Sequence, residues 1–329
     1  MSAPTLRASS IRGIGAYRPR RSVPNSEIVD RIDSSDEWIR TRSGITSRRI
    51  AEPDETVVSM SVWASNAALA DAGIKASEVD VVLVATVSHL MQTPAAATLI
   101  AHQIGATPAA AFDVSAACAG FTYGIALASD MVRVGTARNV LVIGVEKLSD
   151  ITNPVDRGTA FIFADGAGAV VVGASEEQGI GPVVWGADGD KYDLIRQTVA
   201  WDDVFAEEEK VWPALQMQGA SVFRWASFEM AKVANEAMAA AGVTVDDLDA
   251  FIPHQANMRI TDAMARTLKL PPDVVIARDI AEQGNTSAAS VPLAMARLIE
   301  EGQIKTGDKA LLIAFGAGLA YAAQVVTVP

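Results

Sequence analysis

The sequence predicts an α/β protein built from two duplicated halves. "ALADAGIKASEVDVVLVA" at 68–85 resembles "AMAAAGVTVDDLDAFIPH" at 237–254, and "ARNVLVIG" at 137–144 resembles "GDKALLIA" at 307–314. Each member of the first pair is an alanine-rich helix, a glycine stop, an acidic turn and an apolar strand. Each member of the second pair has the composition of a buried strand. Alternation of strands and helices in both halves predicts sheets covered by helices.

A third pair of similar stretches indicates where a site lies. "CAGFTYGIALASDMVRVG" at 118–135 aligns with "NTSAASVPLAMARLIEEG" at 285–302, and both lead from small residues into a helix that ends at glycine. This register places Cys118 opposite Asn285, and His254 follows the strand of the second half. All three residues are therefore expected at strand-to-helix boundaries, where ligands bind in such folds.

Composition indicates a globular protein with a large core. Of the 329 residues, 50% are hydrophobic and 20% are charged, and the length suggests two structural units. The single cysteine excludes a disulfide framework and a cysteine-rich metal site, and it suits a reducing cytoplasm. The uncharged stretches 92–112 and 310–329 are interrupted by polar residues, Gly or Pro, so we expect buried elements rather than membrane spans. The N-terminus lacks the apolar core of a signal peptide.

Charge is unevenly distributed along the chain. The formal net charge is −12, yet residues 1–50 contain ten arginines and five acidic residues, a net +5. The overall acidity disfavours nucleic-acid binding by bulk charge. The basic N-terminal region either attracts a phosphorylated small molecule or is an ordinary solvated arginine surface.

The only cysteine lies among very small residues, in "FDVSAACAGF" at 112–121. A lone cysteine is often a small buried hydrophobe. At a helix start, however, unpaired N–H groups and the helix dipole stabilise a thiolate. Small neighbours also permit a tight turn and the approach of a bulky substrate. This context favours Cys118 as a nucleophile.

The two partner residues have different chemical capacities. His254, at the carboxyl end of a buried strand, can act as a base or a hydrogen-bond donor. Asn285 can only donate or accept hydrogen bonds, and a helix N-cap is its alternative role. We expect structural roles for His89 and His102. Papain-like hydrolases also use Cys, His and Asn in this order, but their cysteine lies near the mature N-terminus in another motif.

Six motifs carry a family resemblance that runs along the whole chain. They are "SSDEWIRTRSGI" (34–45), "DVSAACAGF", "DRGTAFIFADGAGAVVV" (156–172), "PHQANMRI", "GNTSAAS" and "AFGAGLAYA". Together they resemble the β-ketoacyl-acyl carrier protein synthase III family of thiolase-like condensing enzymes. Degradative thiolases would need a second catalytic cysteine, and elongating ketosynthases use two histidines. Glycine-rich 165–169 is no phosphate loop, because no Gly-Lys-Ser/Thr follows; we expect a tight turn there.

The resemblance implies a fold and a reaction. The fold is thiolase-like, with halves 1–174 and 175–329 in a five-layer αβαβα arrangement. Cys118 would take an acyl group from acyl-CoA, while the N–H groups of Cys118 and Ala317 hold the oxyanion; the family usually has Gly where Ala317 stands. His254 and Asn285 would stabilise the enolate left when a malonyl thioester on acyl carrier protein loses CO₂. The carbanion then attacks acyl-Cys118 and gives a 3-oxoacyl product.

The resemblance also implies binding residues and partners. Trp38 and Arg157 would sandwich the CoA adenine, Arg42 would hold the nucleotide end, and Asn257 would touch the pantetheine arm. Three arginines would dock the acidic carrier protein: Arg224, Arg259 and Arg266. Thr93 would reach across a homodimer interface to the end of the partner's acyl pocket, where a bulky Phe limits the primer to acetyl size.

The expected partners are acyl-CoA, malonyl-acyl carrier protein and a second copy of the chain. We expect no metal, no cofactor, no nucleic acid and no membrane association, and a cytoplasmic location. Two alternatives stay open: a priming acyltransferase that does not condense, and a non-catalytic acyl-CoA-binding protein.

Overall fold

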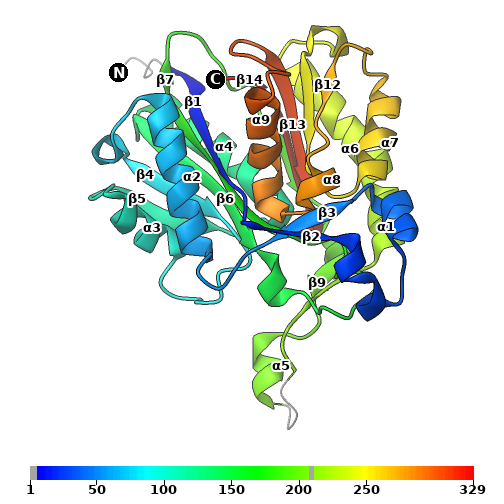
Figure 1. Ribbon diagram of the computed structural model, residues 1–329. Coiled ribbons are helices and arrows are strands. Elements are labelled where there is room, and N and C mark those ends of the chain that lie inside the picture. The colour runs from blue at the N-terminus through cyan, green and yellow to red at the C-terminus, as the bar shows by residue number, and fades with distance from the viewer. Residues whose placement is uncertain (1–5, 207–210) are drawn as a thin grey trace.

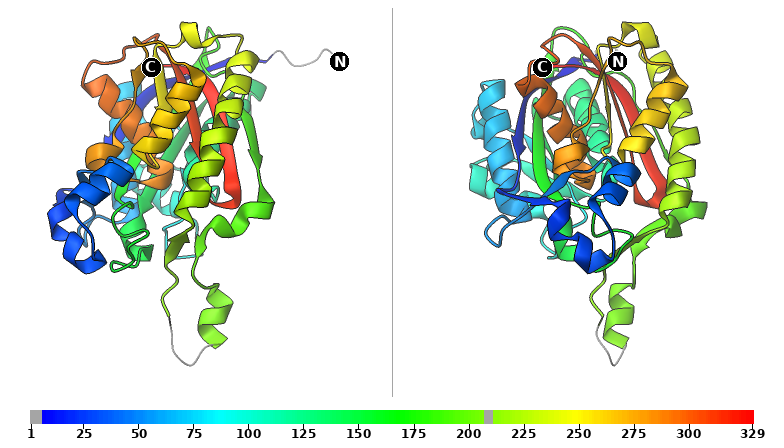
Figure 2. Two further views of the ribbon diagram at one scale, coloured as in Figure 1. Left: turned by 90° about the vertical axis from the view of Figure 1, so that its right-hand side faces the viewer. Right: turned by 45° about the vertical axis from the view of Figure 1, so that its right-hand side comes forward.

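The computed structural model describes residues 6–206 and 211–329, which fold into five stacked layers (Figure 1). Two five-stranded sheets lie on either side of a central pair of helices, and further helices cover the outer face of each sheet. The layers are seen from two further directions in Figure 2. The expected α/β architecture with a five-layer arrangement is confirmed.

The two sheets have the same topology, as a duplicated chain requires. The first has the order β1-β7-β6-β4-β5 and the second the order β12-β11-β13-β14-β8. In each sheet the second strand from one edge (β4 or β11) is parallel to both neighbours, and the remaining pairs are antiparallel. The strands of the first sheet are β1 Ala8–Tyr17, β4 Val81–Ala85, β5 Ala110–Val114, β6 Asn139–Lys147 and β7 Asp165–Ser175. Those of the second are β8 Val184–Ala187, β11 Ala250–Pro253, β12 Val275–Ile276, β13 Lys309–Phe315 and β14 Ala320–Thr327.

Helices in three layers enclose these sheets. The outer helices of the first half are α2 Val57–Ala72 and α3 Ala96–Ile104. The central pair is α4 Gly120–Val134 and α9 Ser290–Glu300. The outer helices of the second half are α6 Gly219–Ala240 and α7 Met258–Leu268. One apolar cluster surrounds the central helices between the two sheets, and a separate cluster fills the space between each sheet and its outer helices. α4 and α9 contact both sheets, which explains their apolar surfaces: a helix buried on several sides cannot carry a wide polar face.

The remaining elements lie around one end of the sheets. A two-stranded antiparallel sheet near the N-terminus packs with α1 and α8 against a fourth apolar cluster. α5 lies on an excursion that projects away from the body of the molecule (Figures 1 and 2). These elements are β2 Arg21–Pro24, β3 Ser47–Ile50, α1 Asp36–Ser43, β9 Ile195–Gln197, α5 Trp201–Ala206, β10 Leu215–Met217 and α8 Ile280–Gln283.

The two long uncharged stretches are internal elements of the fold. Residues 92–112 include α3 and the start of β5, and 310–329 include most of β13 and all of β14. Among the residues that the structure describes, no helix has both the length and the apolar character needed to cross a bilayer.

The glycine-rich segment 165–169 is a strand, and the expected turn is wrong. It forms the beginning of β7, paired on both sides by β1 and β6. A Cβ on Gly168 would lie 2.6 Å from the Cβ of Pro292 in α9. The glycines therefore permit close packing of a central helix on the sheet, which composition alone does not distinguish from a turn.

The expected division after residue 174 lies close to the change of sheet. β7, the last strand of the first sheet, ends at Ser175, and β8 opens the second sheet at Val184. The halves nevertheless share the central helical layer and the apolar cluster around it.

Gly15 in β1 provides a test of this packing. A Cβ there would lie 2.2 Å from the Ala64 carbonyl oxygen in α2. Gly15→Ala should therefore destabilise the fold by about 1–3 kcal/mol, because backbone atoms have to move apart. The measurement is the midpoint of thermal unfolding by circular dichroism. Gly219→Ala is the control, since nothing lies within 4 Å of its Cβ position; equal midpoints for the two variants would contradict the prediction.

Candidate active site

Two matching elbows form the centre of the site. A short 3-10 helix at Ala117–Ala119 leads into α4, and its counterpart at Ser287–Ala289 leads into α9. The first residue of each has a left-handed backbone, with φ 45° at Ala117 and 48° at Ser287. Such conformations are rare for residues other than glycine and cluster at functional sites.

The elbows correct the predicted register of the third repeat. Because Ala117 corresponds to Ser287, the counterpart of Cys118 is Ala288, not Asn285. Asn285 lies before the second elbow. The earlier alignment matched small residues to small residues, whereas the common backbone turn is what the two halves share.

Glycines bring the elbow of each half against a strand end of the other. A Cβ on Gly316, which follows β13, would lie 2.5 Å from the Cys118 nitrogen. A Cβ on Gly144 of β6 would lie 2.2 Å from the Ala288 carbonyl oxygen. Both contacts leave no room for a side chain. Cys118 therefore lies directly beside the chain of the second half.

The Cys118 thiol is in an environment that opposes its ionisation. The residue is partly exposed and precedes the first residue of α4 by two positions. Burial raises the pKa of Cys118 to about 12, an interaction with the Ser287 side chain lowers it, and the charge of Glu146 raises it further. The expected stabilisation by the helix start therefore has to compete with desolvation.

His254 lies at the end of β11 and is neutral. The residue is 3% exposed, and its backbone N–H donates to the Ile313 carbonyl at 2.7 Å. The imidazole ring packs edge-on against Phe315, with 5.5 Å between the ring centroids. Burial lowers the pKa of His254 to about 3. Phe315 directly precedes Gly316, so the packing brings the imidazole toward Cys118.

Ser290 determines which nitrogen of His254 carries the proton. The Ser290 hydroxyl lies 2.7 Å from His254 Nδ1 and accepts a hydrogen bond from the Gln255 N–H at 3.3 Å. Among the described residues, His254 Nδ1 is the only acceptor for the Ser290 proton. Nδ1 therefore accepts, and Nε2–H is left as a donor.

Asn285 is held so that its amide nitrogen is available. Asn285 is 4% exposed. Its backbone N–H donates to the Ile162 carbonyl, and its backbone carbonyl accepts from the Ala164 N–H, each at 2.9 Å. Its Oδ1 accepts from the Ser287 N–H at 2.8 Å. The N-cap of the short helix is Thr286, so the alternative role of Asn285 as an N-cap is wrong, and the bond from Ser287 instead orients the Asn285 side chain. Within the part of the chain that the structure describes, no partner is seen for Nδ2.

Ala317 fits where the family usually has glycine. Its φ is not in the left-handed region, so a methyl group is accommodated; the neighbouring Gly318 adopts the unusual φ of 120°. Gly316, the residue before Ala317, contacts the backbone of Cys118.

The four residues expected to bind CoA are brought together from separate segments. The guanidinium carbons of Arg42 and Arg157 lie 5.9 and 5.2 Å from the centroid of the Trp38 ring. The Asn257 side chain donates to the Arg42 carbonyl at 3.0 Å. Arg42 and Arg157 are exposed, and Trp38 is half-buried. The cluster is therefore a cationic, aromatic surface.

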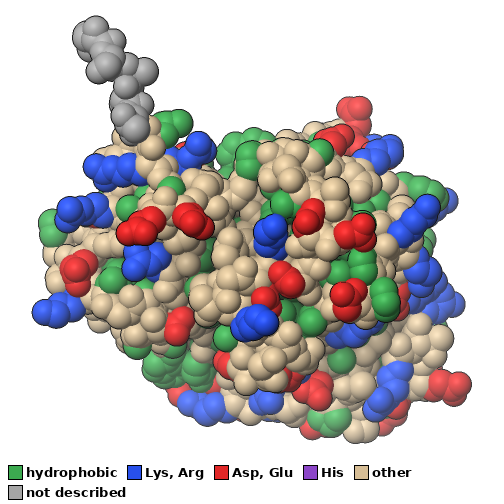
Figure 3. Space-filling model, turned by 90° about the horizontal axis from the view of Figure 1, so that it is seen from above, with side chains coloured by type: hydrophobic (Ala, Val, Ile, Leu, Met, Phe, Trp, Pro, Cys, Tyr) green, Lys and Arg blue, Asp and Glu red, His purple; other side chains and the backbone are tan. Residues whose placement is uncertain are grey.

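The three expected carrier-docking arginines are exposed on two adjacent helices. Arg224 is on α6, and Arg259 and Arg266 are on α7. Arg259 lies 5.1 Å from the centroid of Phe223, and none of the three forms an ion pair with a described residue. Elsewhere charges of both signs are interspersed, as on the face shown in Figure 3.

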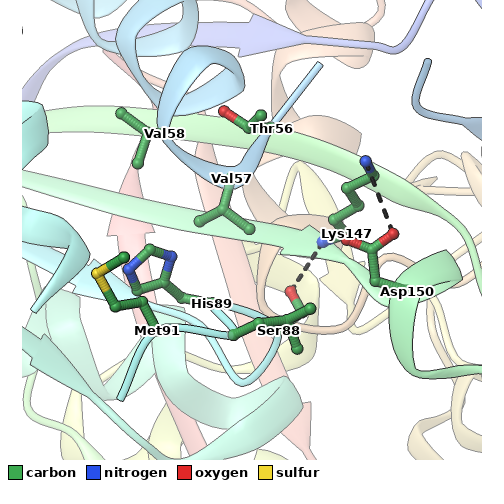
Figure 4. Close-up of a pocket in the computed structure, with 9 residues that line it drawn as sticks. Thr56, Val57, Val58, Ser88, His89, Met91, Lys147 and Asp150 are labelled. Atoms are coloured by element: carbon green, nitrogen blue, oxygen red, sulfur yellow. Dashed lines mark hydrogen bonds and ion pairs between the residues drawn. The ribbon is translucent and has the colours of Figure 1, made fainter. Parts of the chain in front are cut away.

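The loop between β4 and α3 carries Thr93 and lines a cavity of about 480 Å³ (Figure 4). Thr93 itself is exposed. His89, expected to be structural, lines this cavity with Met91 and Val57, and Lys147 and Asp150 form an ion pair of 3.6 Å at its polar end. His102 is exposed on α3.

Comparisons with known proteins agree along the whole chain. Residues 112–189 match the family model described as 3-Oxoacyl-[acyl-carrier-protein (ACP)] synthase III, and residues 238–328 match the model of its C-terminal part. A beta-ketoacyl-[acyl-carrier-protein] synthase III 1 of Streptomyces coelicolor is 60% identical, covering 97% of this chain and 96% of the relative. A mycobacterial beta-ketoacyl-[acyl-carrier-protein] synthase III of Mycobacterium avium is 54% identical, covering 96% and 94%.

The chain belongs to the 3-oxoacyl-acyl carrier protein synthase III family. It is a condensing acyltransferase that joins an acyl-CoA starter to malonyl-acyl carrier protein, beginning a fatty-acid or polyketide chain. The expected family, fold and enzyme class are confirmed.

Solved structures show the same fold. The priming β-ketosynthase of the R1128 polyketide pathway superposes with a TM-score of 0.98 at 48% identity, covering 100% of this chain and 98% of that one. A 3-oxoacyl-[acyl-carrier-protein] synthase III from Aquifex aeolicus superposes with a TM-score of 0.89 at 38% identity, covering 97% and 100%.

Sequence reasoning missed Ser290, Ser287 and Glu146 at this synthase site. All three are buried polar residues around the elbows. The two serines belong to the quoted "GNTSAAS" motif, so their small polar side chains before a helix were a usable signal. Glu146 offered a different signal, an acidic residue at the end of an otherwise apolar strand.

Ser290→Ala should slow condensation about tenfold while leaving acylation of Cys118 unchanged. The variant removes one hydrogen bond worth about 1–1.5 kcal/mol, so His254 no longer holds its proton solely at Nε2. Acylation is read by intact mass, and condensation by decarboxylation of malonyl-acyl carrier protein. The control is Ser65→Ala, which removes a buried hydroxyl without a partner in α2. Equal condensation rates for both variants would contradict the assignment.

Proposed function

We propose that Cys118 carries the acyl group and that His254 and Asn285 stabilise the enolate of the malonyl unit. One observation carries this proposal. A neutral imidazole with a donating Nε2–H and an amide whose Nδ2 has no described partner hydrogen-bond to the second elbow and the helix start after it, and that elbow contacts the one that bears the only thiol. Two neutral donors suit an oxygen that becomes negative only during the reaction.

In the first half-reaction, the Cys118 thiolate attacks the thioester carbonyl carbon of acyl-CoA. The N–H groups of Cys118 and Ala317 hold the oxyanion of the tetrahedral intermediate. The C–S bond to CoA then breaks, and the CoA thiolate takes up the proton that Cys118 lost. The products are acyl-Cys118 and free CoA.

In the second half-reaction, malonyl-acyl carrier protein loses CO₂ and leaves an enolate. His254 Nε2–H and Asn285 Nδ2–H donate to its thioester oxygen. The enolate carbon attacks the acyl-Cys118 carbonyl, the C–S bond breaks, and 3-oxoacyl-acyl carrier protein is released. The Cys118 sulfur leaves as a thiolate and takes up one proton from solvent, which restores the thiol. Simple acyl transfer would need neither donor, so their presence favours condensation over a transfer-only role.

The Trp38 cluster is proposed to hold the nucleotide end of CoA, with Asn257 at the pantetheine arm. An adenine between two flat groups needs about 7 Å, twice the usual contact distance. Arg157 lies only 5.2 Å from the Trp38 centroid, so it has to move outward when the adenine enters. Its 4.0 Å ion pair with exposed Asp33 is weak enough to permit this movement.

A homodimer through β5 is proposed. β5 is an edge strand of the first sheet, and an unpaired edge favours pairing with another chain. Phe112 on β5 and three further apolar side chains nearby in the sequence are exposed: Leu90, Met91 and Leu99. Because Thr93 is in the same loop as Leu90, such a dimer would bring Thr93 toward the partner. We also propose a cytoplasmic location and a reaction that needs no cofactor.

Two substitutions separate the half-reactions. Cys118→Ser should abolish acyl-enzyme formation, because a hydroxyl is a far weaker nucleophile without a dedicated base. Asn285→Ala should still acylate but lose ~10²–10³ in decarboxylation rate. The readouts are the mass shift on incubation with a panel of acyl-CoAs, followed by CO₂ release from malonyl-acyl carrier protein. Normal labelling of Cys118→Ser, or normal condensation by Asn285→Ala, would refute the assigned role.

Arg259→Glu should raise the KM for malonyl-acyl carrier protein and weaken its salt dependence, while acylation by acyl-CoA hardly changes. The reason is that a basic patch steers an acidic partner and is screened by salt. The matched control is Arg138→Glu, another exposed arginine, at the start of β6. Equal damage to both half-reactions would make Arg259 a structural residue.

The small Thr93 side chain is proposed to leave the partner's acyl pocket long or wide, so branched or medium acyl-CoAs should outcompete acetyl-CoA. Each buried methylene contributes about 0.8 kcal/mol. Thr93→Phe should therefore reduce turnover of larger acyl-CoAs more than that of acetyl-CoA. The check is kcat/KM across an acyl-CoA series. A uniform loss, or none, would place Thr93 outside the pocket.

A further inference from the structure

Acylation of Cys118 requires a proton acceptor, and His254 is poorly suited to that role. Its Nδ1 accepts from Ser290, so Nε2 carries a hydrogen and has no lone pair for the thiol proton. The tautomer that suits the enolate is therefore the wrong one for deprotonating Cys118. A different group beside the thiol has to receive this proton.

Glu146 is a buried carboxylate that is hydrogen-bonded to Ser287 of the second elbow, and the second elbow contacts the Cys118 elbow. It lies at the end of β6 and is 0% exposed. Ser287 donates to its Oε1 at 3.1 Å. Ser287 also opens the second elbow, which contacts the Cys118 elbow, and its side chain favours the ionised form of Cys118. Ser287 thus connects the carboxylate to the thiol.

The two oxygens of this carboxylate have different surroundings. Oε2 accepts from the Ser88 hydroxyl at 2.5 Å, the Val87 N–H at 3.1 Å and the Thr86 hydroxyl at 3.2 Å. Oε1 accepts only from Ser287 among the described residues. Oε2 is therefore an anchor to the loop after β4, and Oε1 keeps a lone pair that can bind a proton.

The charged groups around Glu146 leave it without a counter-ion. Cys118 is close enough for its pKa to respond to the Glu146 charge, and Lys147, the next residue of β6, is engaged with Asp150. No described cation forms an ion pair with the Glu146 carboxylate. Its negative charge opposes ionisation of Cys118, and that opposition disappears once Glu146 is protonated.

We propose that Glu146 accepts the Cys118 proton through the Ser287 hydroxyl during acylation. As the thiol proton moves to Ser287 Oγ, the hydroxyl proton moves to Glu146 Oε1. Ser287 then donates to the thiolate, which attacks acyl-CoA. When the CoA thiolate leaves, the proton returns by the same route to give CoA thiol, so Glu146 ends ionised. Glu146 is a positioning residue here, because it acts only through Ser287.

This inference rests on the proposed acyl-Cys118 intermediate, and the full chain permits a clean test because Cys118 is its only cysteine. The measurement is the rate of acylation by acyl-CoA, read as intact mass between about pH 5.5 and about pH 9, a range that brackets the ionisation of Glu146. Burial raises the pKa of Glu146 to about 7. The wild-type rate should therefore rise through about pH 7 as Glu146 ionises.

Glu146→Gln should acylate about 10²-fold more slowly at pH 8 and lose the rise near pH 7. Its amide oxygen can keep the three bonds to the loop after β4, while its NH₂ group cannot accept a proton. Ser287→Ala should behave alike and keep the backbone N–H that orients Asn285. The double variant should be no slower than either single variant. Condensation by enzyme that has been acylated beforehand should be unchanged.

Glu55→Gln is the matched control, a 0% exposed carboxylate in a hydrogen-bonded network with Tyr17 and Arg20. It should keep the wild-type rate and profile. If Glu146→Gln is unstable, Ser287→Ala decides, since alanine already occupies the equivalent left-handed position at Ala117. Wild-type acylation in both Glu146→Gln and Ser287→Ala, or additive losses in the double variant, would overturn the relay. Failure of the wild-type chain to acylate at all would instead refute the proposed function.

Discussion

The site depends on two close contacts, in each of which a glycine of one half touches the elbow of the other half. Gly316 leaves no space for a Cβ beside the Cys118 nitrogen, and Gly144 leaves none beside the Ala288 carbonyl. In each half, the end of a central strand (β6 or β13) therefore lies in direct contact with the elbow of the other half. Without these two approaches, the thiol of the first half and the donors of the second half could not share one site.

The pseudo-symmetry of the fold makes the division of roles between the halves visible. Cys118 on one elbow corresponds to Ala288 on the other, and the left-handed Ala117 corresponds to Ser287. The first half supplies the nucleophile on an apolar elbow. The second half supplies polar groups at the equivalent turn, including Ser287 and, one residue after that elbow, Ser290. The same elbow conformation thus serves a nucleophile in one half and hydrogen-bonding groups in the other, because the side chains at equivalent positions differ.

Burial sets the electrostatics of the site more than charge pairing does. It keeps His254 neutral, raises the pKa of the Cys118 thiol, and raises the pKa of Glu146 to about 7. In a site shielded from water, neutral hydrogen-bond donors stabilise a forming oxyanion or enolate strongly, because no water screens the new negative charge. The same dryness makes removal of the thiol proton difficult, which is why the hydrogen-bonded path from Cys118 to Glu146 matters.

The sequence by itself determined the order of elements and the duplication, and it singled out Cys118, His254 and Asn285 as the candidate site. Strand and helix patterns arise from residues a few positions apart, and a single thiol in a run of small residues is visible without any tertiary contact. It also predicted that Trp38, Arg42, Arg157 and Asn257 act together, through the resemblance alone. The prediction of a turn at 165–169 was wrong, because a glycine that permits close helix packing cannot be distinguished by the local sequence from a glycine that permits a turn.

Only the tertiary structure decided which residues act on one another. The bond from Ser290 to His254 joins residues 36 positions apart, and the bond from Ser287 to Glu146 joins residues 141 positions apart. The tautomer of His254, the pKa values of the buried groups and the register of the two elbows all follow from such contacts. They depend on how deeply the layers bury each group and on which backbone atoms touch, and neither quantity is encoded in the local pattern of the chain.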